Sequence, residues 1–316
     1  MSEHRPLGPR TVAAVRCGSG APRLVGGGYM SGELRETRTA VPPSRFESIQ
    51  EFLDARGEVR GTVEIDLDGF PLHFFYDWRG SRTTFVSFSG TVSAKVEHVP
   101  AWAADGISRG LGMNRVLISD PSVKLSSNLR LGWYAGSVRQ RRLQEDIARL
   151  LAGLRGSGER TLLFGASGGG FAALLQAAVL PGAIAFVSNP QTDITRYTRM
   201  AVERYLKIAW GIDAFREGED LPFAHEVLSI YERPGNSETI YLQNAGDADH
   251  IEKHYAPFRR AVHPERHVEY VLKNLGPGHV GPDRETFVRM LIAIRDHEQW
   301  DELVATLRTI EVTRNA

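Results

Sequence analysis

The sequence predicts an α/β protein in which a mostly parallel central sheet has helices on both faces. Three observations lead to this prediction. A hairpin pattern comes early in the chain, and from about residue 83 onward short apolar runs alternate with longer segments of helical spacing. A G-x-S-x-G motif at residues 165–169 follows one of these apolar runs and precedes a helix-like run.

The composition is that of an ordinary globular chain. It has 316 residues, of which 42% are hydrophobic and 24% are charged, enough for one large α/β domain or two small ones. Lys and Arg together number 38, as do Asp and Glu, so the charge balance does not point to nucleic acid or an anionic membrane as the main partner. The polar start and the lack of a long apolar run lead us to expect a cytoplasmic protein with no membrane span.

The first part of the chain is expected to be a flexible tail without catalytic content. Residues 1–42 are rich in Gly, Arg, Ser and Pro, whereas residues 43–316 carry the patterns of a folded domain. The single cysteine, Cys17, lies in this tail and has no second cysteine to pair with. A short helix is expected over residues 44–55.

The remaining elements follow in an order that suits a parallel sheet. Residues 61–67 alternate in hydropathy, turn at Asp68-Gly69 and continue at residues 72–76, which is a hairpin pattern. Further strands are expected at residues 83–88, 115–119, 161–164, 183–187, 238–242 and 267–272. Helices are expected at residues 137–154, 171–178, 283–296 and 298–307.

This order is typical of the α/β-hydrolase fold, with a mostly parallel central sheet and helices on both faces. Residues 191–236 are expected to be mostly helical, and they lie where that fold inserts a helical cap. The whole of residues 43–316 is therefore expected to form one α/β-hydrolase domain.

The turn at residues 165–169 has the pattern of a nucleophile elbow. Such a turn is so sharp that the serine, here Ser167, takes up a strained backbone conformation, and the flanking glycines leave room for it. Ser167 is therefore the candidate nucleophile. The amide of Gly168, at the start of the helix, is a candidate oxyanion donor. The alternative is a glycine-rich turn with no catalytic role.

A serine nucleophile needs a base and an orienting carboxylate, which follow it in this fold in the order Asp or Glu, then His. His279 stands in a loop rich in Gly and Pro after the last expected strand, and it is the candidate base. Asp247 follows the strand expected at residues 238–242 and is the preferred acid, with Asp249 as the alternative. Asp193, after the preceding strand, is a third candidate.

Two further features have competing interpretations. The loop after residues 83–88 holds Gly90, a candidate second oxyanion donor, with Thr91 as an alternative and a plain strand-ending turn as the other interpretation. His250 and His254 are spaced i,i+4, which on a helix would suit zinc. The other interpretation is that they cap a helix and orient the acid loop. We expect no metal and no cofactor.

Several strings of residues resemble the pattern of one family. They are Asp120-Pro121, residues 131–136, 164–169, 189–192 and 241–247, and His250, His254 and Pro257-Phe258. On these strings the sequence resembles the α/β-hydrolase-like proteins encoded with bacterial surface-polysaccharide and glycoprotein-export genes, including the accessory Sec system component. The resemblance covers residues 60–290 and favours Asp247 over Asp249. It implies a serine esterase or acyl-transfer role on acylated sugars or related metabolites.

Three functions follow from these residues. The first is a serine hydrolase that cleaves an ester or thioester of a small-molecule acyl substrate through Ser167, His279 and Asp247. The second is an acyltransferase on the same three residues, in a drier pocket that admits an alcohol or amine. The third is a non-catalytic binding protein that has kept the fold.

The cap segment has aromatic and cationic side chains of open role. The aromatic residues either line an acyl or sugar pocket or pack the cap on the core; they are Tyr197, Tyr205, Trp210 and Phe215. The arginines either meet an anionic substrate group or form a solvated helix face; they are Arg196, Arg199 and Arg204.

Overall fold

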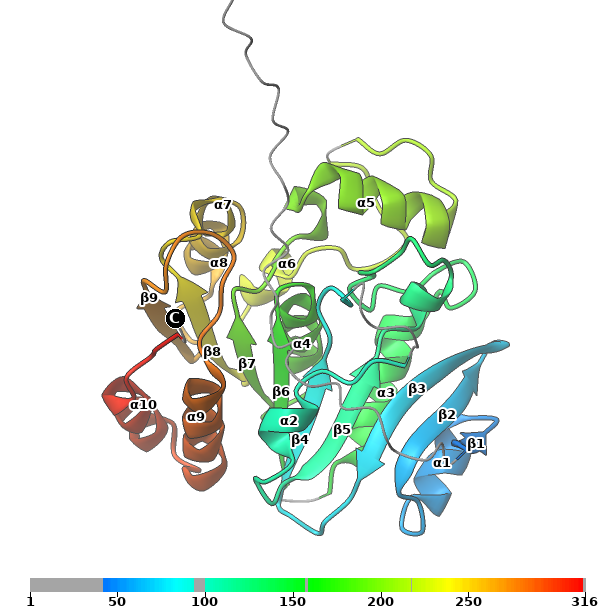
Figure 1. Cartoon of the computed structure of the whole chain (residues 1–316), viewed down its shortest axis with the longest axis horizontal. Helices are drawn as coiled ribbons and strands as arrows, with labels where there is room; N and C mark the ends of the chain where they lie inside the picture. Colours follow the sequence, from blue (N-terminus) through cyan, green and yellow to red (C-terminus); the bar gives the residue numbers. More distant parts are fainter. Residues whose placement is uncertain (1–41, 94–99, 157–158, 217, 315–316) are drawn as a thin grey trace, which may run out of the picture.

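A computed structural model describes residues 42–93, 100–156, 159–216 and 218–314 (Figure 1). The tail expected over residues 1–42, Cys17 included, lies outside these ranges except for Pro42. None of the helices in the described ranges is long and apolar enough to cross a membrane.

Over the described residues, nine strands form one sheet in the order β1-β2-β3-β5-β4-β6-β7-β8-β9. The strands are β1 (Ser44–Phe46), β2 (Gly61–Leu67), β3 (Phe70–Asp77), β4 (Thr83–Phe88), β5 (Asn114–Ser119), β6 (Arg160–Ala166), β7 (Ile184–Ser188), β8 (Glu238–Asn244) and β9 (Val268–Lys273). Strand β3 runs antiparallel to both of its neighbours, β2 and β5. Every other neighbouring pair is parallel, so the expected early hairpin and mostly parallel sheet are both present.

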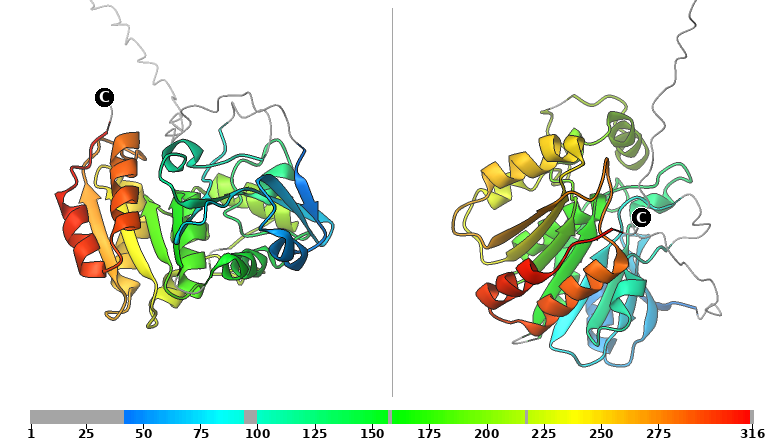
Figure 2. Two further views of the ribbon diagram at one scale, coloured as in Figure 1. Left: turned by 90° about the horizontal axis from the view of Figure 1, so that it is seen from below. Right: turned by 60° about the vertical axis from the view of Figure 1, so that its left-hand side comes forward.

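Helices cover both faces of this sheet (Figure 2). They are α1 (Ile49–Ala55), α2 (Asp105–Ser108), α3 (Leu143–Leu154), α4 (Gly168–Val179), α5 (Arg199–Tyr205), α6 (Leu228–Tyr231), α7 (Ala248–His250), α8 (Ala256–Ala261), α9 (Arg284–Asp296) and α10 (Trp300–Thr309). Short 3-10 turns occupy η1 (Pro121–Lys124) and η2 (Ile194–Arg196), and wider π-type turns occupy η3 (Leu206–Trp210) and η4 (Ile251–Tyr255).

Two apolar clusters hold the layers together, one on each face of the sheet. One cluster contains buried side chains of α1, α3 and α4, such as Phe52, Ile147 and Phe171. The other contains side chains of α2, α9 and α10, such as Phe287 and Leu303. Because both faces are covered, β4, β5 and β7 are buried along their whole length, which explains why each contains adjacent apolar residues instead of strict alternation.

Two expectations for the helices were wrong at their N-terminal ends. The helix expected over residues 44–55 begins only at Ile49, because Ser48 caps it by accepting a hydrogen bond from the Glu51 amide. The three residues of β1 pair with β2 instead. The helix expected over residues 137–154 begins at Leu143, since Gln140 is held in a turn and donates a hydrogen bond to the Phe70 carbonyl.

The cap segment at residues 191–236 is less helical than expected. It holds η2, α5, η3 and α6, but the described residues from Gly211 to Val227 form no helix. Its two ends are tied by backbone hydrogen bonds instead, from Ile194 to the His225 carbonyl (2.8 Å) and from Val227 to the Thr192 carbonyl (3.0 Å). Figure 1 shows α5 beyond the same edge of the sheet as α7, where β7 and β8 end.

Candidate active site

Ser167 stands on the sharp turn between β6 and α4. It has φ 54° and ψ −122°, a left-handed conformation that is strained for a residue with a side chain. Its amide donates to the Ser188 carbonyl at the end of β7 (3.0 Å), and its own carbonyl accepts from Gly170 (3.0 Å) and Gln191 (3.1 Å). The turn is therefore fixed on both sides by backbone hydrogen bonds, and Ser167 is only 6% exposed.

The glycines around Ser167 are required by close backbone approach. A Cβ on Gly165 would lie 2.1 Å from the Gly169 carbonyl oxygen, and one on Gly169 would lie 2.3 Å from that of Phe88. Strand β6, helix α4 and the end of β4 thus approach one another more closely than any side chain would permit. This steric requirement is what the G-x-S-x-G pattern encodes.

A side-chain network reaches the Ser167 hydroxyl. Gln191 donates from Nε2 to Ser167 Oγ (3.2 Å) and accepts through Oε1 from the indole N–H of Trp133. Gln191 and Trp133 are buried, and Trp133 has a positive φ of 54°. Sequence reasoning assigned no role to either residue, although both lie in strings that carry the family resemblance, at residues 131–136 and 189–192.

Both candidate oxyanion donors lie beside the elbow. A Cβ on Gly90 would lie 2.9 Å from the Ala166 carbonyl oxygen and 3.7 Å from Ser167 Cβ, so the backbone of the loop after β4 is in contact with the turn. Gly168 is the first residue of α4 and packs so closely on Leu131 that a Cβ would lie 2.5 Å from Leu131 Cδ1. Thr91, the alternative to Gly90, is exposed.

The loop of Gly90 is held by a buried tyrosine. The Tyr134 hydroxyl accepts a hydrogen bond from the Ser89 amide (2.7 Å) and donates to the Ile118 carbonyl (2.7 Å). The carboxylate of Asp120 in turn accepts from the Tyr134 amide (3.0 Å). Asp120 is buried, and burial raises the pKa of its carboxyl group despite hydrogen bonds from neighbouring amides.

The structure brings Asp247 and His279 together. Asp247 follows β8, His279 lies in the loop after β9, and Asp247 Oδ2 is 2.7 Å from His279 Nδ1. With the proton on Nδ1, the imidazole donates to the carboxylate and Nε2 is left as the basic nitrogen. Asp247 also caps α7, because its Oδ1 accepts from the amide of His250, the last residue of that helix (3.3 Å).

The alternative acids have other partners. The Asp249 side chain is 63% exposed and forms an ion pair with Lys253 (2.6 Å). Asp193 accepts hydrogen bonds from the amide (2.9 Å) and the hydroxyl (2.7 Å) of Thr195, so it caps η2. The geometry therefore favours Asp247 as the carboxylate that orients the His279 imidazole.

Two asparagines hold the His279 loop against the ends of the strands. Asn244 donates from Nδ2 to the carbonyls of Gly276 (2.9 Å) and Gly278 (2.7 Å). Asn189 donates to the Val280 carbonyl (2.8 Å) and accepts from the Asn244 amide (2.6 Å). Because Asn189 directly follows Ser188, which binds the Ser167 amide, the loop of the candidate base is tied to the elbow.

Burial and hydrogen bonds shift the pKa values of this pair. Burial would raise the pKa of Asp247, but hydrogen bonds from His250 and His279 hold it well below its usual range. Burial lowers the pKa of His279, and the hydrogen bond to Asp247 opposes that effect only in part. At neutral pH the pair is therefore a carboxylate beside a neutral imidazole, which is the state that a general base requires.

The ring of His250 packs on that of His279, and the ring of His254 packs on that of His250. The ring centroid of His250 is 4.0 Å from that of His279 and 4.9 Å from that of His254. His250 Nδ1 lies 3.3 Å from Asp247 Oδ2, so both imidazoles share one carboxylate oxygen. His254 Nδ1 instead accepts from the Thr192 amide (3.3 Å), which ties η4 to the start of the cap.

The side chains that could hold a metal ion are not the His250 and His254 pair that the i,i+4 spacing suggested. Among the described residues, the group close enough to hold an ion is Asp247, His250 and His279, with ligand atoms within 4.8 Å of one another. His254 is not part of it. These same atoms form the Asp–His hydrogen bonds described above, so an ion there would replace the contacts that orient His279.

Solved structures share this architecture. A capsule O-acetyltransferase of Neisseria meningitidis serogroup A, solved as a mutant in complex with CoA, is 16% identical, with a TM-score of 0.52 over 72% of this chain and 93% of that chain. A 2,6-dihydroxy-pseudo-oxynicotine hydrolase is 16% identical, with a TM-score of 0.51 over 84% of this chain and 74% of that chain. The chain has the α/β-hydrolase fold.

The likeness extends to the fold alone at this level of identity. No protein-family model matches the chain, and no curated protein matches its sequence. The resemblance to proteins of glycoprotein-export clusters therefore rests on the sequence strings. What the α/β-hydrolase fold can do in this chain depends on the residues at its strand ends.

Proposed function

We propose that this protein is a serine-dependent enzyme acting on an ester or thioester, with Ser167 as nucleophile, His279 as base and Asp247 as acid. The observation that carries the proposal is the 2.7 Å contact between Asp247 and His279 on a loop tied to the strained elbow of Ser167. A strained serine, together with a neutral and oriented imidazole on a loop tied to the same turn, supplies the parts that nucleophilic catalysis requires.

The chemistry proceeds in two steps. His279 Nε2 takes the proton from Ser167 Oγ as the oxygen attacks the substrate carbonyl carbon, and the amides of Gly168 and Gly90 stabilise the oxyanion. The intermediate collapses when the alcohol or thiol leaves with the proton from His279, and the acyl group stays on Ser167. Asp247 remains ionised and holds the Nδ1–H in place. In the second step His279 Nε2 takes a proton from water or another acceptor as it attacks the acyl carbon, the bond to Ser167 Oγ breaks, and that oxygen recovers the proton from His279.

A second candidate is transfer of the acyl group to an alcohol or amine. It is favoured by the fold similarity to the capsule O-acetyltransferase solved with CoA. On this candidate an acylated carrier delivers the acyl group to Ser167, and a sugar hydroxyl of a surface polysaccharide or a related metabolite accepts it. The same three residues serve both reactions, and exclusion of water decides between them.

The first test is covalent labelling with a fluorophosphonate, followed by intact-protein mass spectrometry. We expect one adduct on the wild type, none on Ser167→Ala, and labelling slowed by at least about 10³-fold in His279→Ala. Ser188→Ala is the matched control, because its buried hydroxyl lies next to the elbow and has no hydrogen-bond partner among the described residues. That variant keeps the adduct.

The second test concerns the acyl acceptor. Turnover of 4-nitrophenyl acetate and acetyl coenzyme A is followed with water alone and with added sugar alcohols, and the products are separated by mass. Hydrolysis at an unchanged rate with every acceptor favours the hydrolase. Wild-type protein that is folded and takes up no fluorophosphonate contradicts the proposal and favours the non-catalytic interpretation.

A further inference from the structure

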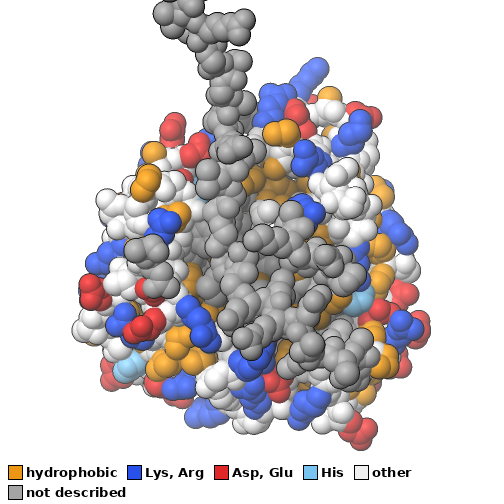
Figure 3. All heavy atoms as spheres, in the orientation of Figure 1, with side chains coloured by type: hydrophobic (Ala, Val, Ile, Leu, Met, Phe, Trp, Pro, Cys, Tyr) orange, Lys and Arg blue, Asp and Glu red, His pale blue; other side chains and the backbone are white. Residues whose placement is uncertain are grey.

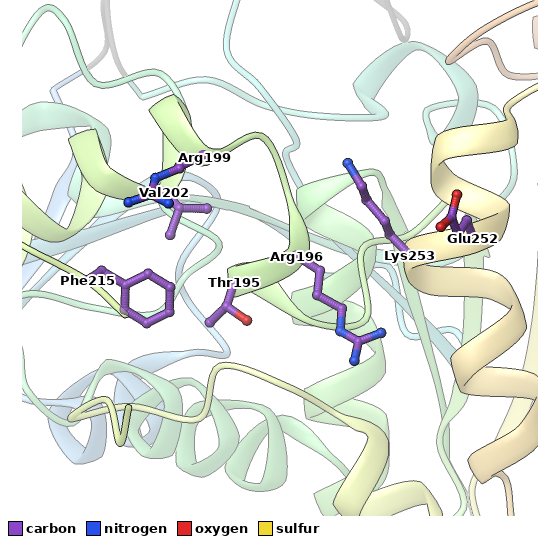
Figure 4. Close-up of a pocket in the computed structure, with 7 residues that line it drawn as sticks. All are labelled: Thr195, Arg196, Arg199, Val202, Phe215, Glu252 and Lys253. Carbon is purple, nitrogen blue, oxygen red and sulfur yellow. The ribbon is translucent and has the colours of Figure 1, made fainter. Parts of the chain in front are cut away.

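A charged hollow lies between the cap segment and η4. Over the part of the molecule where Figure 1 draws α5, Lys and Arg side chains surround hydrophobic ones (Figure 3). The close-up in Figure 4 shows the residues that line a pocket there. The pocket has a volume of about 470 Å³. Its walls come from η2, α5, η4 and the loop after η3, through Thr195, Arg196, Arg199, Val202, Phe215, Glu252 and Lys253. This volume lies within the range of small-molecule sites.

The charged walls of the pocket are mainly cationic. Arg196, Arg199 and Lys253 line it, against one carboxylate, Glu252. Their side chains are 43%, 82% and 40% exposed, so a ligand from solvent can reach them. Val202 and Phe215 add an apolar wall. A ligand suited to this pocket therefore combines a negative group with an apolar or ring-shaped part.

Each of these three cations is paired with a carboxylate outside the lining of the pocket, and Lys253 pairs with Asp249 (2.6 Å). Asp193 Oδ2 is 3.4 Å from Arg196 Nε, and Glu203 Oε1 is 2.7 Å from Arg199 Nε. Neither carboxylate lines the pocket, and both pairs engage Nε rather than the terminal nitrogens of the guanidinium fork. Exposed pairs of this kind are weak, whereas a phosphate group forms stronger charge-assisted hydrogen bonds.

The pocket adjoins the candidate active site. The ring of Tyr197, which directly follows Arg196, lies 6.3 Å from the His250 ring and 6.0 Å from the Trp133 ring. Trp133 donates a hydrogen bond to Gln191, and Gln191 donates one to Ser167 Oγ. Lys253 belongs to η4, the turn that continues directly from His250. A group bound between Arg196 and Lys253 is therefore next to the residues that surround the nucleophile.

We infer that this pocket binds a phosphate-bearing part of the substrate and so positions the acyl carbon at Ser167. The inference rests on the proposed function and adds the substrate class. The phosphate can belong to the acyl donor, as in a phosphorylated thioester carrier, or to the acceptor, as in a phosphorylated sugar. The cationic side chains and the apolar wall of the pocket suit a phosphate group and an adjoining apolar or ring-shaped part, whether these belong to the donor or to the acceptor.

Binding is tested without turnover, in the Ser167→Ala protein, by titration calorimetry with inorganic pyrophosphate. Removing two cations by Arg196→Gln with Lys253→Gln is expected to weaken binding at least about tenfold, since each charged hydrogen bond contributes that order of affinity. The matched control is Arg204→Gln with Arg233→Gln, which removes two exposed arginines outside the lining of the pocket. We expect less than about a twofold change there.

Kinetics of the otherwise wild-type enzyme identify the source of the phosphate. The pocket variant is expected to raise KM for acetyl coenzyme A about tenfold and to leave kcat/KM for the neutral 4-nitrophenyl acetate within about twofold, if the donor carries the phosphate. If the acceptor carries it, KM rises about tenfold for a phosphorylated sugar acceptor instead. Either result supports the pocket.

Two results would overturn the inference. One is the lack of pyrophosphate binding to the parent protein at millimolar concentration, and the other is equal binding by the pocket and control variants. Intact fluorophosphonate labelling of the same variants with Ser167 restored shows that the proposed function survives such a failure. Conversely, wild type that is not labelled defeats the proposed function, while the calorimetry still decides whether the pocket binds phosphate.

Discussion

The two halves of the candidate site are held by different forces. Around Ser167 the chain is fixed by backbone hydrogen bonds and by glycines whose neighbours leave no room for a Cβ. Around His279 the loop is held by the side chains of Asn189, Asn244 and Asp247, in addition to a backbone hydrogen bond from Gly278 to the Gly246 carbonyl (2.9 Å). The strained conformation of Ser167 therefore depends on shape, whereas the orientation of the His279 ring depends on the charge and proton positions of a few atoms.

This difference indicates how each half should fail. Adding one carbon atom breaks the elbow through steric conflict, at any pH. Replacing one carboxylate oxygen of Asp247 by nitrogen removes the charged acceptor of the His279 hydrogen bond, whereas the fold is retained. Variants in the two halves therefore test the contrast directly.

The largest effect is expected from Asp247→Asn. The amide nitrogen or oxygen that replaces Oδ2 no longer holds His279 with a charged acceptor, and the wrong tautomer becomes favoured. We expect kcat to fall by about 10⁴-fold while the protein stays folded. Steady-state hydrolysis of 4-nitrophenyl acetate measures the loss, and circular dichroism checks the fold.

Asp249→Asn is the matched control for this change. It removes the same charge two residues away, where the carboxylate is exposed and pairs with Lys253. We expect kcat within about twofold of wild type, because exposed ion pairs contribute little. If Asp249→Asn loses as much activity as Asp247→Asn, the assignment of the acid is wrong.

Gly165→Ala tests the other half. The new Cβ would lie 2.1 Å from the Gly169 carbonyl oxygen, and that neighbour is backbone and cannot rotate away. We expect the free energy of unfolding to fall by about 3 kcal/mol, measured by urea denaturation. Gly57→Ala is the control, since a Cβ there meets nothing within 4 Å, and it should change stability by less than about 0.5 kcal/mol. Equal stability of the two variants would show that the elbow relaxes freely.

The sequence predicted the sheet well because buried parallel strands have nearly continuous apolar sequences. The strand expected at residues 83–88 is β4, Thr83–Phe88, without any change of boundary. Strand β1 was missed because three residues at an edge of the sheet carry no periodic pattern. The cap was overestimated as helical, since its loops are set by contacts between its two ends.

Some residues of the candidate site could also be predicted from the sequence, whereas others could not. Ser167, Asp247 and His279 could be chosen from chain order, because strand ends of a parallel sheet meet at one edge. Gln191 could not, since its role depends on meeting Trp133, which is 58 residues away in the sequence. Nor does local sequence indicate that Trp133 takes a left-handed conformation. Such tertiary contacts have no signature in residue spacing.

The smallest effect is expected from pH on the free energy of unfolding. It distinguishes the histidine cluster, whose protonation changes with pH, from the elbow, whose steric fit does not. Burial, together with the charges of His250, Lys253, His279 and Arg196, lowers the pKa of His254 from 6.5 to about 2. The unfolded chain therefore binds this proton first as the pH falls below about 6.5, and the folded state loses stability from there downward. The contribution of His254 to that loss should approach about 1.4 kcal/mol per pH unit once the pH is about one unit below 6.5.

His254→Asn isolates this contribution, because its side-chain oxygen can still accept the hydrogen bond from the Thr192 amide at the place of Nδ1. Unfolding free energies of wild type and variant are measured by urea denaturation between about pH 7.5 and about pH 5, on either side of the unfolded-state pKa. Over this range the variant should lose about 2 kcal/mol less stability than wild type, whatever its offset at neutral pH, with nearly all of the difference arising below about pH 6.5. Gly165→Ala should instead lie below wild type by the same amount at every pH, since no titrating group enters its steric conflict. Parallel curves for wild type and His254→Asn would mean that this histidine is not held neutral by burial.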